Sequence, residues 1–278
     1  MINNLSITIL VDNHSPDNAR GTEHGLSFWI EADGFRLLFD TGQSDLMFDN
    51  GALSGSDPAQ ADALVLSHGH YDHTGGVARL LELRQDLPIY CHPGVVIPRY
   101  SRQHDGSMKP VGISRPAAME LMRREQLIRW VNTPCYLADG IGCTGSIPRR
   151  TLFEDTGGAF YLDPGGVHHD PIDDDLSLWI ETPAGVVVIT GCCHSGIVNT
   201  LSHIRHSAGC RSFHRIIGGL HLVNATEKRM DATIDYLRTE QWNFMVPCHC
   251  TGERAVEAFR REFPGRVEQG HAGMVIRY

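Results

Sequence analysis

The sequence predicts an α/β protein of two similar halves, built as a two-sheet sandwich with helices. The first observation is a repeat: Leu-Ser-Phe-Trp-Ile-Glu at 26–31 returns as Leu-Ser-Leu-Trp-Ile-Glu at 176–181. In both places a short turn and a second β-rich run follow, which is the signature of a hairpin. The second observation is that helical and β patterns occur in both halves. Two similar halves, each a sheet with helices, fit a two-sheet sandwich better than a doubly wound sheet.

The other expected elements support this plan. Apolar spacing predicts helices after Gly76, from Ile197 and over 253–263, and Thr226 is suited to cap a further helix. Strands are expected at 5–11, 61–66, 215–219, 244–247 and 274–278. At 278 residues the chain is long enough for a large core. We expect one domain over 1–278.

Composition limits the classes of partner. The formal net charge of −9 argues against nucleic-acid binding, which needs a basic footprint. No apolar run approaches the roughly 20 residues of a membrane span, and the N-terminus lacks the pattern of a secretory signal. We therefore expect a cytoplasmic protein with a small-molecule partner and no nucleic-acid or membrane partner. The oligomeric state is left open, a homodimer included.

One segment, 92–150, is basic. It holds nine Lys or Arg and only four acidic residues, in a chain that is acidic as a whole. One interpretation is a solvated helix face. The other is a basic cap or insertion over an anionic substrate, with Arg115 and Arg149 as candidate substrate-binding residues.

A dense cluster of possible metal ligands lies at 68–73. His68 and His70 are separated by one residue, so in extended backbone both side chains point to the same side. Asp72 and His73 are adjacent and project differently, which suits a second ion close by. Three histidines and an aspartate within six residues indicate a metal site, because imidazole and carboxylate are common metal ligands.

The pattern His68-x-His70-x-Asp72-His73 resembles the signature of the metallo-β-lactamase superfamily. Further segments resemble one branch of it, the dihydropterin–ribofuranosylaminobenzene phosphate synthase-like proteins. They are Glu23-His24-Gly25-Leu26-Ser27, Phe39-Asp40-Thr41-Gly42-Gln43, Thr190-Gly191-Cys192-Cys193-His194-Ser195-Gly196, Gly218-Gly219-Leu220-His221 and Pro247-Cys248-His249-Cys250-Thr251-Gly252. The match spans nearly the whole chain in the expected order.

The resemblance implies the metallo-β-lactamase fold, an αββα four-layer sandwich with metals at one edge. It implies that His68 and His70 hold one ion and that Asp72 and His73 hold another. A late histidine, here His249, completes the second site in the family. The implied cofactor is one or two divalent metal ions: zinc, with manganese and iron as alternatives.

The chain departs from the family in the loop after Thr190-Gly191. Many members place a bridging aspartate where this chain has Cys192. We expect His194 to supply the ligand from this loop and Cys192 to lie close without binding. The alternatives, a ligand from Cys192 or from the loop histidines His168 and His169, stay open.

Other residues receive roles outside the ligand set. The resemblance favours His221 as a substrate binder or proton donor. We expect Asp40 to orient a metal-bound histidine, as carboxylates commonly do, and His24 to act in a similar way. Asp72 is expected to orient the attacking water.

These residues predict a metal-dependent hydrolase or closely related transferase with a small anionic, phosphate-bearing or pterin-related substrate. Metals lower the pKa of bound water to about 7, so hydroxide forms at neutral pH. One alternative is an iron-dependent redox enzyme on the same fold, because imidazole also suits iron. Another is a ligand sensor without catalytic activity.

Overall fold

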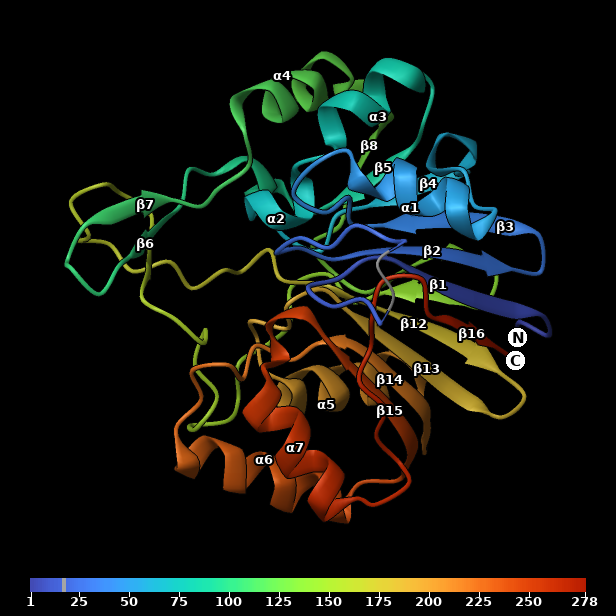
Figure 1. Cartoon of the computed structure of the whole chain (residues 1–278), viewed down its shortest axis with the longest axis vertical. Coiled ribbons are helices and arrows are strands. Elements are labelled where there is room, and N and C mark those ends of the chain that lie inside the picture. Colours follow the sequence, from blue (N-terminus) through green and yellow to red (C-terminus); the bar gives the residue numbers. More distant parts are fainter. Residues whose placement is uncertain (17–18) are drawn as a thin grey trace. The chain divides into compact units, whose positions relative to one another are not determined.

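The computed structural model describes residues 1–16 and 19–278, and the chain divides into two compact units (Figure 1). We call the larger one the N-terminal unit; it comprises Asn4–Trp130, Ala159–Asp174 and His271–Tyr278. The C-terminal unit comprises Met1–Asn3, Val131–Gly158 and Asp175–Gly270. Each unit has its own sheet and helices.

The N-terminal unit is built on a seven-stranded sheet in the order β16-β1-β2-β3-β4-β5-β8. Its strands are β1 (Leu5–Val11), β2 (Ser27–Ala32), β3 (Phe35–Phe39), β4 (Ala63–Val65), β5 (Ile89–Cys91), β8 (Ile128–Trp130) and β16 (Val275–Arg277). Strands β3, β4, β5 and β8 run parallel, so their carboxyl ends meet at one edge. Helices α1 (Leu46–Ser54), α3 (Val77–Leu83) and α4 (Arg115–Arg123) cover one face (Figure 1).

Short elements complete this unit. Helix α2 (Tyr71–Thr74) carries two of the predicted ligands. A small sheet joins β6 (Tyr100–Arg102), β7 (Met108–Pro110) and β11 (Phe160–Tyr161). Single 3₁₀ turns lie at η1 (Pro58–Gln60), η2 (Pro93–Val96) and η3 (Glu125–Leu127).

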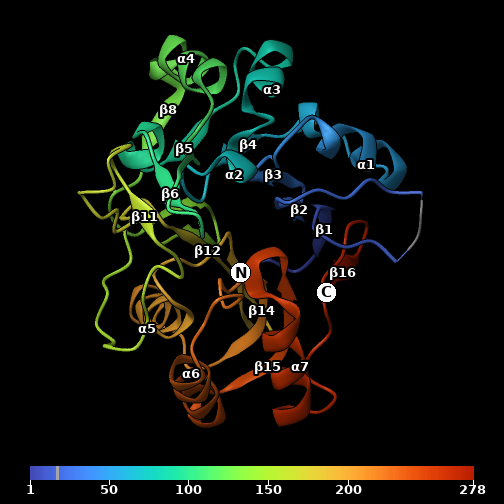
Figure 2. The same cartoon turned by 60° about the vertical axis from the view of Figure 1, so that its left-hand side comes forward.

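The C-terminal unit is built on a six-stranded sheet in the order β15-β14-β13-β12-β10-β9. Its strands are β9 (Cys135–Ala138), β10 (Ile141–Cys143), β12 (Ser177–Thr182), β13 (Gly185–Thr190), β14 (Phe213–Gly219) and β15 (Trp242–Cys248). Strands β13, β14 and β15 are parallel neighbours. Helices α5 (Ile197–Ala208), α6 (Glu227–Thr239) and α7 (Glu253–Glu262) pack beside them, and the turn η4 (His249–Thr251) follows β15 (Figure 2).

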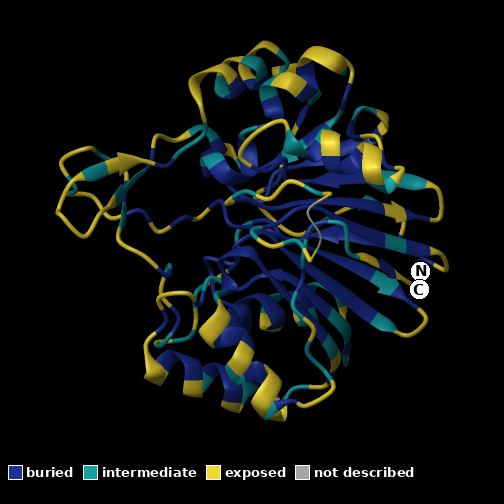
Figure 3. Ribbon diagram, in the orientation of Figure 1, coloured by how far each residue is buried: buried dark blue, intermediate teal, exposed yellow. Residues whose placement is uncertain are grey.

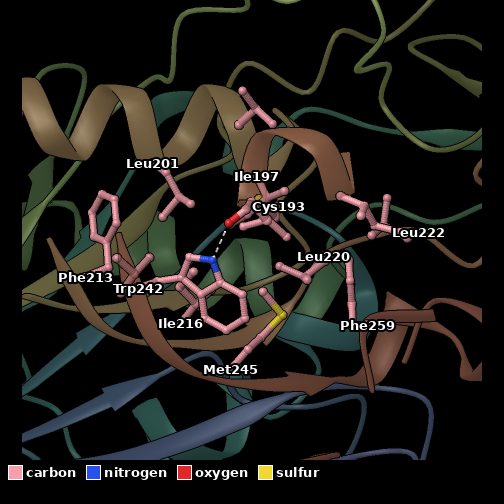
Figure 4. Packing of buried hydrophobic residues seen from close by; sticks show 14 of the residues in the cluster. Cys193, Ile197, Leu201, Phe213, Ile216, Leu220, Leu222, Trp242, Met245 and Phe259 are labelled. Atoms are coloured by element: carbon pink, nitrogen blue, oxygen red, sulfur yellow. Dashed lines mark hydrogen bonds between the residues drawn. The ribbon is translucent and has the colours of Figure 1, made fainter. Parts of the chain in front are cut away.

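Each unit buries an apolar cluster between its sheet and its helices. In the C-terminal unit Leu201, Phe213 and Phe259 are fully buried in this cluster (Figure 4). The indole of Trp242 is buried there too, and its Nε1 donates a hydrogen bond to the Leu237 carbonyl (2.8 Å). The helices carry exposed residues on the sides that face away from the sheets (Figure 3). These clusters hold the ends of the strands in place, and the loops that carry the site residues start from these ends.

The repeated hairpins predicted from sequence are confirmed. Strands β2 and β3 pair antiparallel through a turn at Asp33 and Gly34, both of which have positive φ, as a tight primed turn requires. Strands β12 and β13 also pair antiparallel. The cap at Thr226 is also confirmed, because its side chain accepts a hydrogen bond from the Arg229 amide.

Several elements have weak sequence signals and were not predicted: α1, the small β6-β7-β11 sheet, and strands β9 and β10. The basic segment 92–150 is divided between the units, which change over between Trp130 and Val131. Within residues 1–16 and 19–278, no helix is both long and apolar enough to cross a membrane.

Candidate metal centre

The predicted ligands at 68–73 lie in one tight turn of the N-terminal unit, after β4 and through α2. We call His68, His70, Asp72 and His73 the histidine turn. All four side chains are buried. His68 Nε2 lies 3.0 Å from His70 Nδ1, and the His68 and His73 rings are 4.4 Å apart between centroids. The turn therefore gathers imidazole nitrogens at one point, as the spacing predicts.

Asp40 fixes this turn from the end of β3. Its Oδ1 accepts a hydrogen bond from the Ser67 amide (2.7 Å) and its Oδ2 accepts one from the Ser67 hydroxyl (2.6 Å). The same Oδ2 lies 2.7 Å from His73 Nδ1. Asp40 has a φ of 61°, a conformation that costs a non-glycine residue free energy and recurs at functional sites. The carboxylate thereby sets the orientation of the His73 ring.

The carboxylate of Asp72 faces two histidines. Its Oδ2 lies 3.2 Å from His24 Nε2 and 3.8 Å from His73 Nε2. The His24 side chain is 56% exposed, whereas the Asp72 side chain is only 8% exposed. His24 therefore holds Asp72 from the solvent side of the turn.

A buried ion-pair network contacts the backbone of the histidine turn at Gly69. It was not predicted from the sequence. Arg99 is 2% exposed and donates to Asp170 (2.7 Å) and, through two nitrogens, to Asp174 (2.8 and 2.6 Å). Asp174 also accepts a hydrogen bond from the Gly69 amide (2.8 Å), between His68 and His70. Burial raises the pKa of Asp174, although the Arg99 charge and these hydrogen bonds oppose the shift.

Gly69 is required by packing. A Cβ there would overlap the Val95 carbonyl oxygen and the Arg99 guanidinium. We attribute the glycine to this close approach.

In the C-terminal unit, the predicted site residues follow the carboxyl ends of three neighbouring parallel strands. Cys192 follows β13, His221 follows β14, and His249 follows β15. His221 and His249 have φ values of 44° and 47°, and Cys193 has a φ of 60°. Positive φ at three adjacent strand ends indicates that the surrounding packing holds these turns in place.

His194 is held by its own loop. Its Nδ1 lies 2.8 Å from the Thr156 carbonyl oxygen, and its carbonyl accepts a hydrogen bond from Arg149 (2.6 Å). Its ring lies 4.2 Å from the ring of His221 between centroids.

Two buried carboxylates accept hydrogen bonds from backbone amides that follow His194. Asp175 accepts a hydrogen bond from the Ser195 amide (2.8 Å), and burial raises the pKa of Asp175 to about 6. Glu154 accepts hydrogen bonds from the Val198 and Asn199 amides (2.9 Å each), at the start of α5. Burial also raises the pKa of Glu154. Neither acid lies in a motif, so sequence reasoning had no signal for them.

Three side chains of this unit also converge. The ligating atoms of Cys192, His221 and Cys250 all lie within 4.8 Å of one another. In the sequence, Cys250 belongs to a segment that resembles the family, but no role was predicted for it.

The six predicted ligands are thus divided between the units: four in the histidine turn, and His194 and His249 in the C-terminal unit. That both sets serve one centre rests on the family resemblance and stays a prediction. Of the two arginines predicted to bind substrate, Arg149 contacts the His194 loop and Arg115 is exposed at the first residue of α4.

The alternative ligands and much of the basic segment have other partners. His168 lies 3.2 Å from Asp163, and the His169 ring packs on Tyr161. Arg123 and Arg124 both pair with Glu120, and Arg99 is buried. These pairs reduce the positive charge that 92–150 can offer to a substrate.

The histidine turn fits a divalent metal. Two imidazole nitrogens that share a zinc ion at about 2.1 Å lie roughly 3.4 Å apart in a tetrahedral site, close to the 3.0 Å between His68 Nε2 and His70 Nδ1. The Nδ1 atoms of His68 and His73 contact Ser67 and Asp40, so their Nε2 atoms can serve as ligands. A carboxylate partner for a ligating imidazole is usual in metal sites.

Comparison with known proteins identifies the family of the chain. A family model of the metallo-beta-lactamase superfamily matches residues 20–201. The chain therefore belongs to the metallo-β-lactamase superfamily, as its sequence motif predicts.

Particular relatives define the branch. The chain is 30% identical to 7,8-dihydropterin-6-methyl-4-(beta-D-ribofuranosyl)-aminobenzene-5'-phosphate synthase of Methanocaldococcus jannaschii, over 100% of this chain and 98% of that protein. It is 29% identical to Tm1679, described as a metal-dependent hydrolase of the beta-lactamase superfamily, with a TM-score of 0.82 and 98% of each chain covered. A Zn²⁺-bound PqqB from Methylobacterium extorquens shares the fold alone, with a TM-score of 0.57 and 14% identity over 98% of this chain and 99% of that one. The predicted branch and fold class are confirmed.

Proposed function

We propose that the chain is a metal-dependent hydrolase, or a closely related transferase, whose substrate is small and anionic. The observation that carries this proposal is the histidine turn, in which three imidazoles and a carboxylate are buried together and Asp40 and Asp174 fix the backbone and the His73 ring. A structural core has no need for that arrangement, whereas a metal enzyme needs ligands held in one geometry.

The proposed ligands in this turn are His68, His70, Asp72 and His73. The superfamily resemblance adds His194 and His249 to the set. A divalent ion, for which we favour zinc over manganese or iron, would supply Lewis acidity and lower the pKa of a water molecule to about 7.

The protein's own residues then orient the ligands and transfer protons. Asp72 Oδ2 can accept a proton from water, and His24 at 3.2 Å can hold that carboxylate in position or take up the proton in turn. Asp40 keeps His73 in the tautomer that presents Nε2. Asp174 and Arg99 keep His68 and His70 in register through the Gly69 amide.

The substrate class rests on the relatives and on charge. The M. jannaschii relative is a synthase whose name contains both a dihydropterin and a phosphate. We propose that this chain also takes a phosphate-bearing, pterin-related substrate, with Arg149 and Arg115 as contacts to its anionic groups.

The test is hydrolysis of p-nitrophenyl phosphate and bis(p-nitrophenyl) phosphate by metal-loaded protein. We expect turnover that a chelator abolishes and added zinc or manganese restores. The matched control is Arg79→Ala, an exposed residue on α3, which should keep full activity. Turnover that survives complete removal of metal would contradict the proposal.

A further inference from the structure

A basic groove of the C-terminal unit is lined by one face of α5 and by residues of 148–151. Its volume is about 720 Å³, which is within the range of pockets that hold small-molecule ligands. We propose that this groove binds a small phosphomonoester through Arg150 and His206, at a place separate from the metal centre. Among the described residues that line it there is no predicted metal ligand.

The spacing of residues on α5 builds one wall of the groove. Asn199, His203 and His206 lie four and three positions apart, so their side chains share one face of the helix. All three line the groove, and the wall continues to Gly209 and Cys210, where α5 ends. The helix therefore presents a continuous polar face to this space.

Asn199 fixes the opposite wall against the helix. Its Oδ1 accepts hydrogen bonds from the amides of Arg150 (2.9 Å) and Thr151 (3.1 Å), and its Nδ2 donates to the Thr151 hydroxyl (3.0 Å). Asn199 is itself 3% exposed. These contacts hold the backbone of Arg150 without using its guanidinium. The groove is therefore formed before a ligand binds, which reduces the entropy cost of binding.

The charged side chains that line the groove are basic. They are Arg150, Arg205 and the imidazoles of His203 and His206, and no acid lies among the described lining residues. His203 Nε2 is 3.1 Å from the Thr144 carbonyl oxygen and is occupied by that contact. In a chain with a net charge of −9, a local excess of positive charge attracts anions to this place.

The two arginines contribute differently. Arg205 pairs with Glu240, and its guanidinium lies 5.3 Å from the centroid of the Phe213 ring. Its position is fixed and its charge is compensated. Arg150 and His206 are exposed, and neither side chain has a hydrogen bond or an ion pair within residues 1–16 and 19–278. Their N–H groups are therefore available to a ligand.

A phosphomonoester matches these donors. Guanidinium groups bind phosphate through paired, charge-assisted hydrogen bonds. A phosphomonoester carries about 1.5 to 2 negative charges at pH 7 and three strong acceptor oxygens, whereas a carboxylate has one charge and two oxygens. Arg150 supplies one uncompensated positive charge, and His206 is a side chain that can gain a proton when an anion binds beside it.

The test uses the full-length, metal-loaded protein and phenylphosphonate, a phosphomonoester analogue whose P–C bond is not hydrolysed. Isothermal titration calorimetry at low salt measures the Kd, and benzamide is the uncharged comparison compound. We expect phenylphosphonate to bind and benzamide not to bind. Arg150→Ala should raise the Kd by about 10-fold or more, because it removes hydrogen bonds between charged groups. His206→Ala should raise the Kd by a smaller factor.

Two control variants locate the binding event. Arg211→Ala removes an equal charge from an exposed position that does not line the groove, so the Kd should stay unchanged. His70→Ala removes a proposed ligand of the metal centre. Any phenylphosphonate bound by the metal should be lost in this variant, whereas binding to the groove should remain.

Cys210 provides a readout in the wild-type protein. Its half-buried thiol lines the groove, so bound phenylphosphonate should slow its alkylation by iodoacetamide, as measured by mass spectrometry. Cys135 is a half-buried thiol on β9 that does not line the groove, and its alkylation should keep the same rate. The inference is overturned if phenylphosphonate binds no better than benzamide, or if Arg150→Ala and Arg211→Ala have the same Kd. Loss of all binding in His70→Ala, or no protection of Cys210, would overturn it as well.

Discussion

The two units position possible metal ligands in similar places but use different side chains. Each positions ligating side chains in turns after parallel strands. The N-terminal unit gathers imidazoles and a carboxylate and fixes them with charged side chains, of which Asp40 contacts a ligand ring directly. The C-terminal unit gathers thiols and imidazoles, and its buried acids bind the backbone of the loops. The comparison shows that two similar sheets can carry different ligating side chains and can hold them in place in different ways.

The adjacent residues Asp174 and Asp175 belong to different units, and each binds the backbone of its own unit. Asp174 accepts the amide of Gly69 in the histidine turn, and Asp175 accepts the amide of Ser195 in the His194 loop. Both are buried, and burial raises the pKa of each. Arg99 compensates Asp174 directly, so substitutions in the two networks should have different consequences.

The largest effect should come from the histidine turn. His70→Ala should lower activity by more than about 100-fold and sharply reduce bound metal, because it removes a proposed ligand rather than a supporting group. Metal content by mass spectrometry and far-ultraviolet circular dichroism measure the two consequences. Wild-type metal content in a folded variant would refute the assignment, and loss of folding would show that the metal is structural.

The network behind the turn should matter for stability. Arg99→Ala leaves Asp170 and Asp174 buried without their partner, so the free energy of unfolding should fall by about 3–5 kcal/mol. Urea denaturation measures this change. Arg79→Ala is the control, because it breaks an exposed pair with Glu82 that is worth at most about 1 kcal/mol. An equal loss in both variants would show that the buried network has no special role.

Asp175 predicts a pH dependence in the other unit. With its pKa raised to about 6, against about 3.9 in an unfolded chain, the folded state holds the proton more tightly. The contribution of Asp175 to the free energy of unfolding should therefore fall as the pH rises from about 4 to about 6, by on the order of 3 kcal/mol, and then level off.

Asp175→Asn should remove this decline, whereas Asp173→Asn, at an exposed neighbouring position, should keep it. Urea denaturation across this pH range distinguishes them. An unchanged slope in Asp175→Asn would contradict the role of burial.

The carboxylate behind His73 should have a smaller effect. Asp40→Asn keeps an acceptor for Ser67 but weakens the contact with His73 Nδ1, so the metal affinity should fall about 10–100-fold. Competition with a chromogenic chelator measures the affinity. The control Asp49→Asn lies on the exposed side of α1. Equal affinities in Asp40→Asn and the wild type would remove Asp40 from the site.

Charge steering should give the smallest effect. If Arg115 and Arg149 attract an anionic substrate, kcat/KM should fall as salt rises, because the Debye length is only about 10 Å at 0.1 M. Arg115→Ala and Arg149→Ala should reduce both kcat/KM and its salt dependence. If kcat/KM does not change with salt and neither variant alters it, segment 92–150 does not attract the substrate.

Much of the fold could be predicted because its signals are local. The two hairpins, β1 and helices α5 to α7 follow from alternation, helical spacing and a cap, all within short windows. Strands β9 and β10 and the strands of the small sheet are only two to four residues long, so the sequence shows no clear alternation there and their pairing depends on distant partners. The histidine turn was visible because its ligands are contiguous.

The residues that hold the site in place could not be predicted, because they are far in sequence from the groups that they bind. Asp174 and Glu154 act on backbone amides far along the chain, 105 and 44 residues away, and single acids carry no pattern. Cys250 was visible only as part of a motif, because its closeness to Cys192 depends on the pairing of three strands.

The most direct test of the account is the metal content of the wild-type protein, purified without added metal. The account predicts zinc or manganese bound in proportion to protein, lost on chelation together with activity while the fold persists. Folded, active protein that contains no metal would contradict it, and stoichiometric iron with redox activity would replace the hydrolytic proposal with the redox alternative.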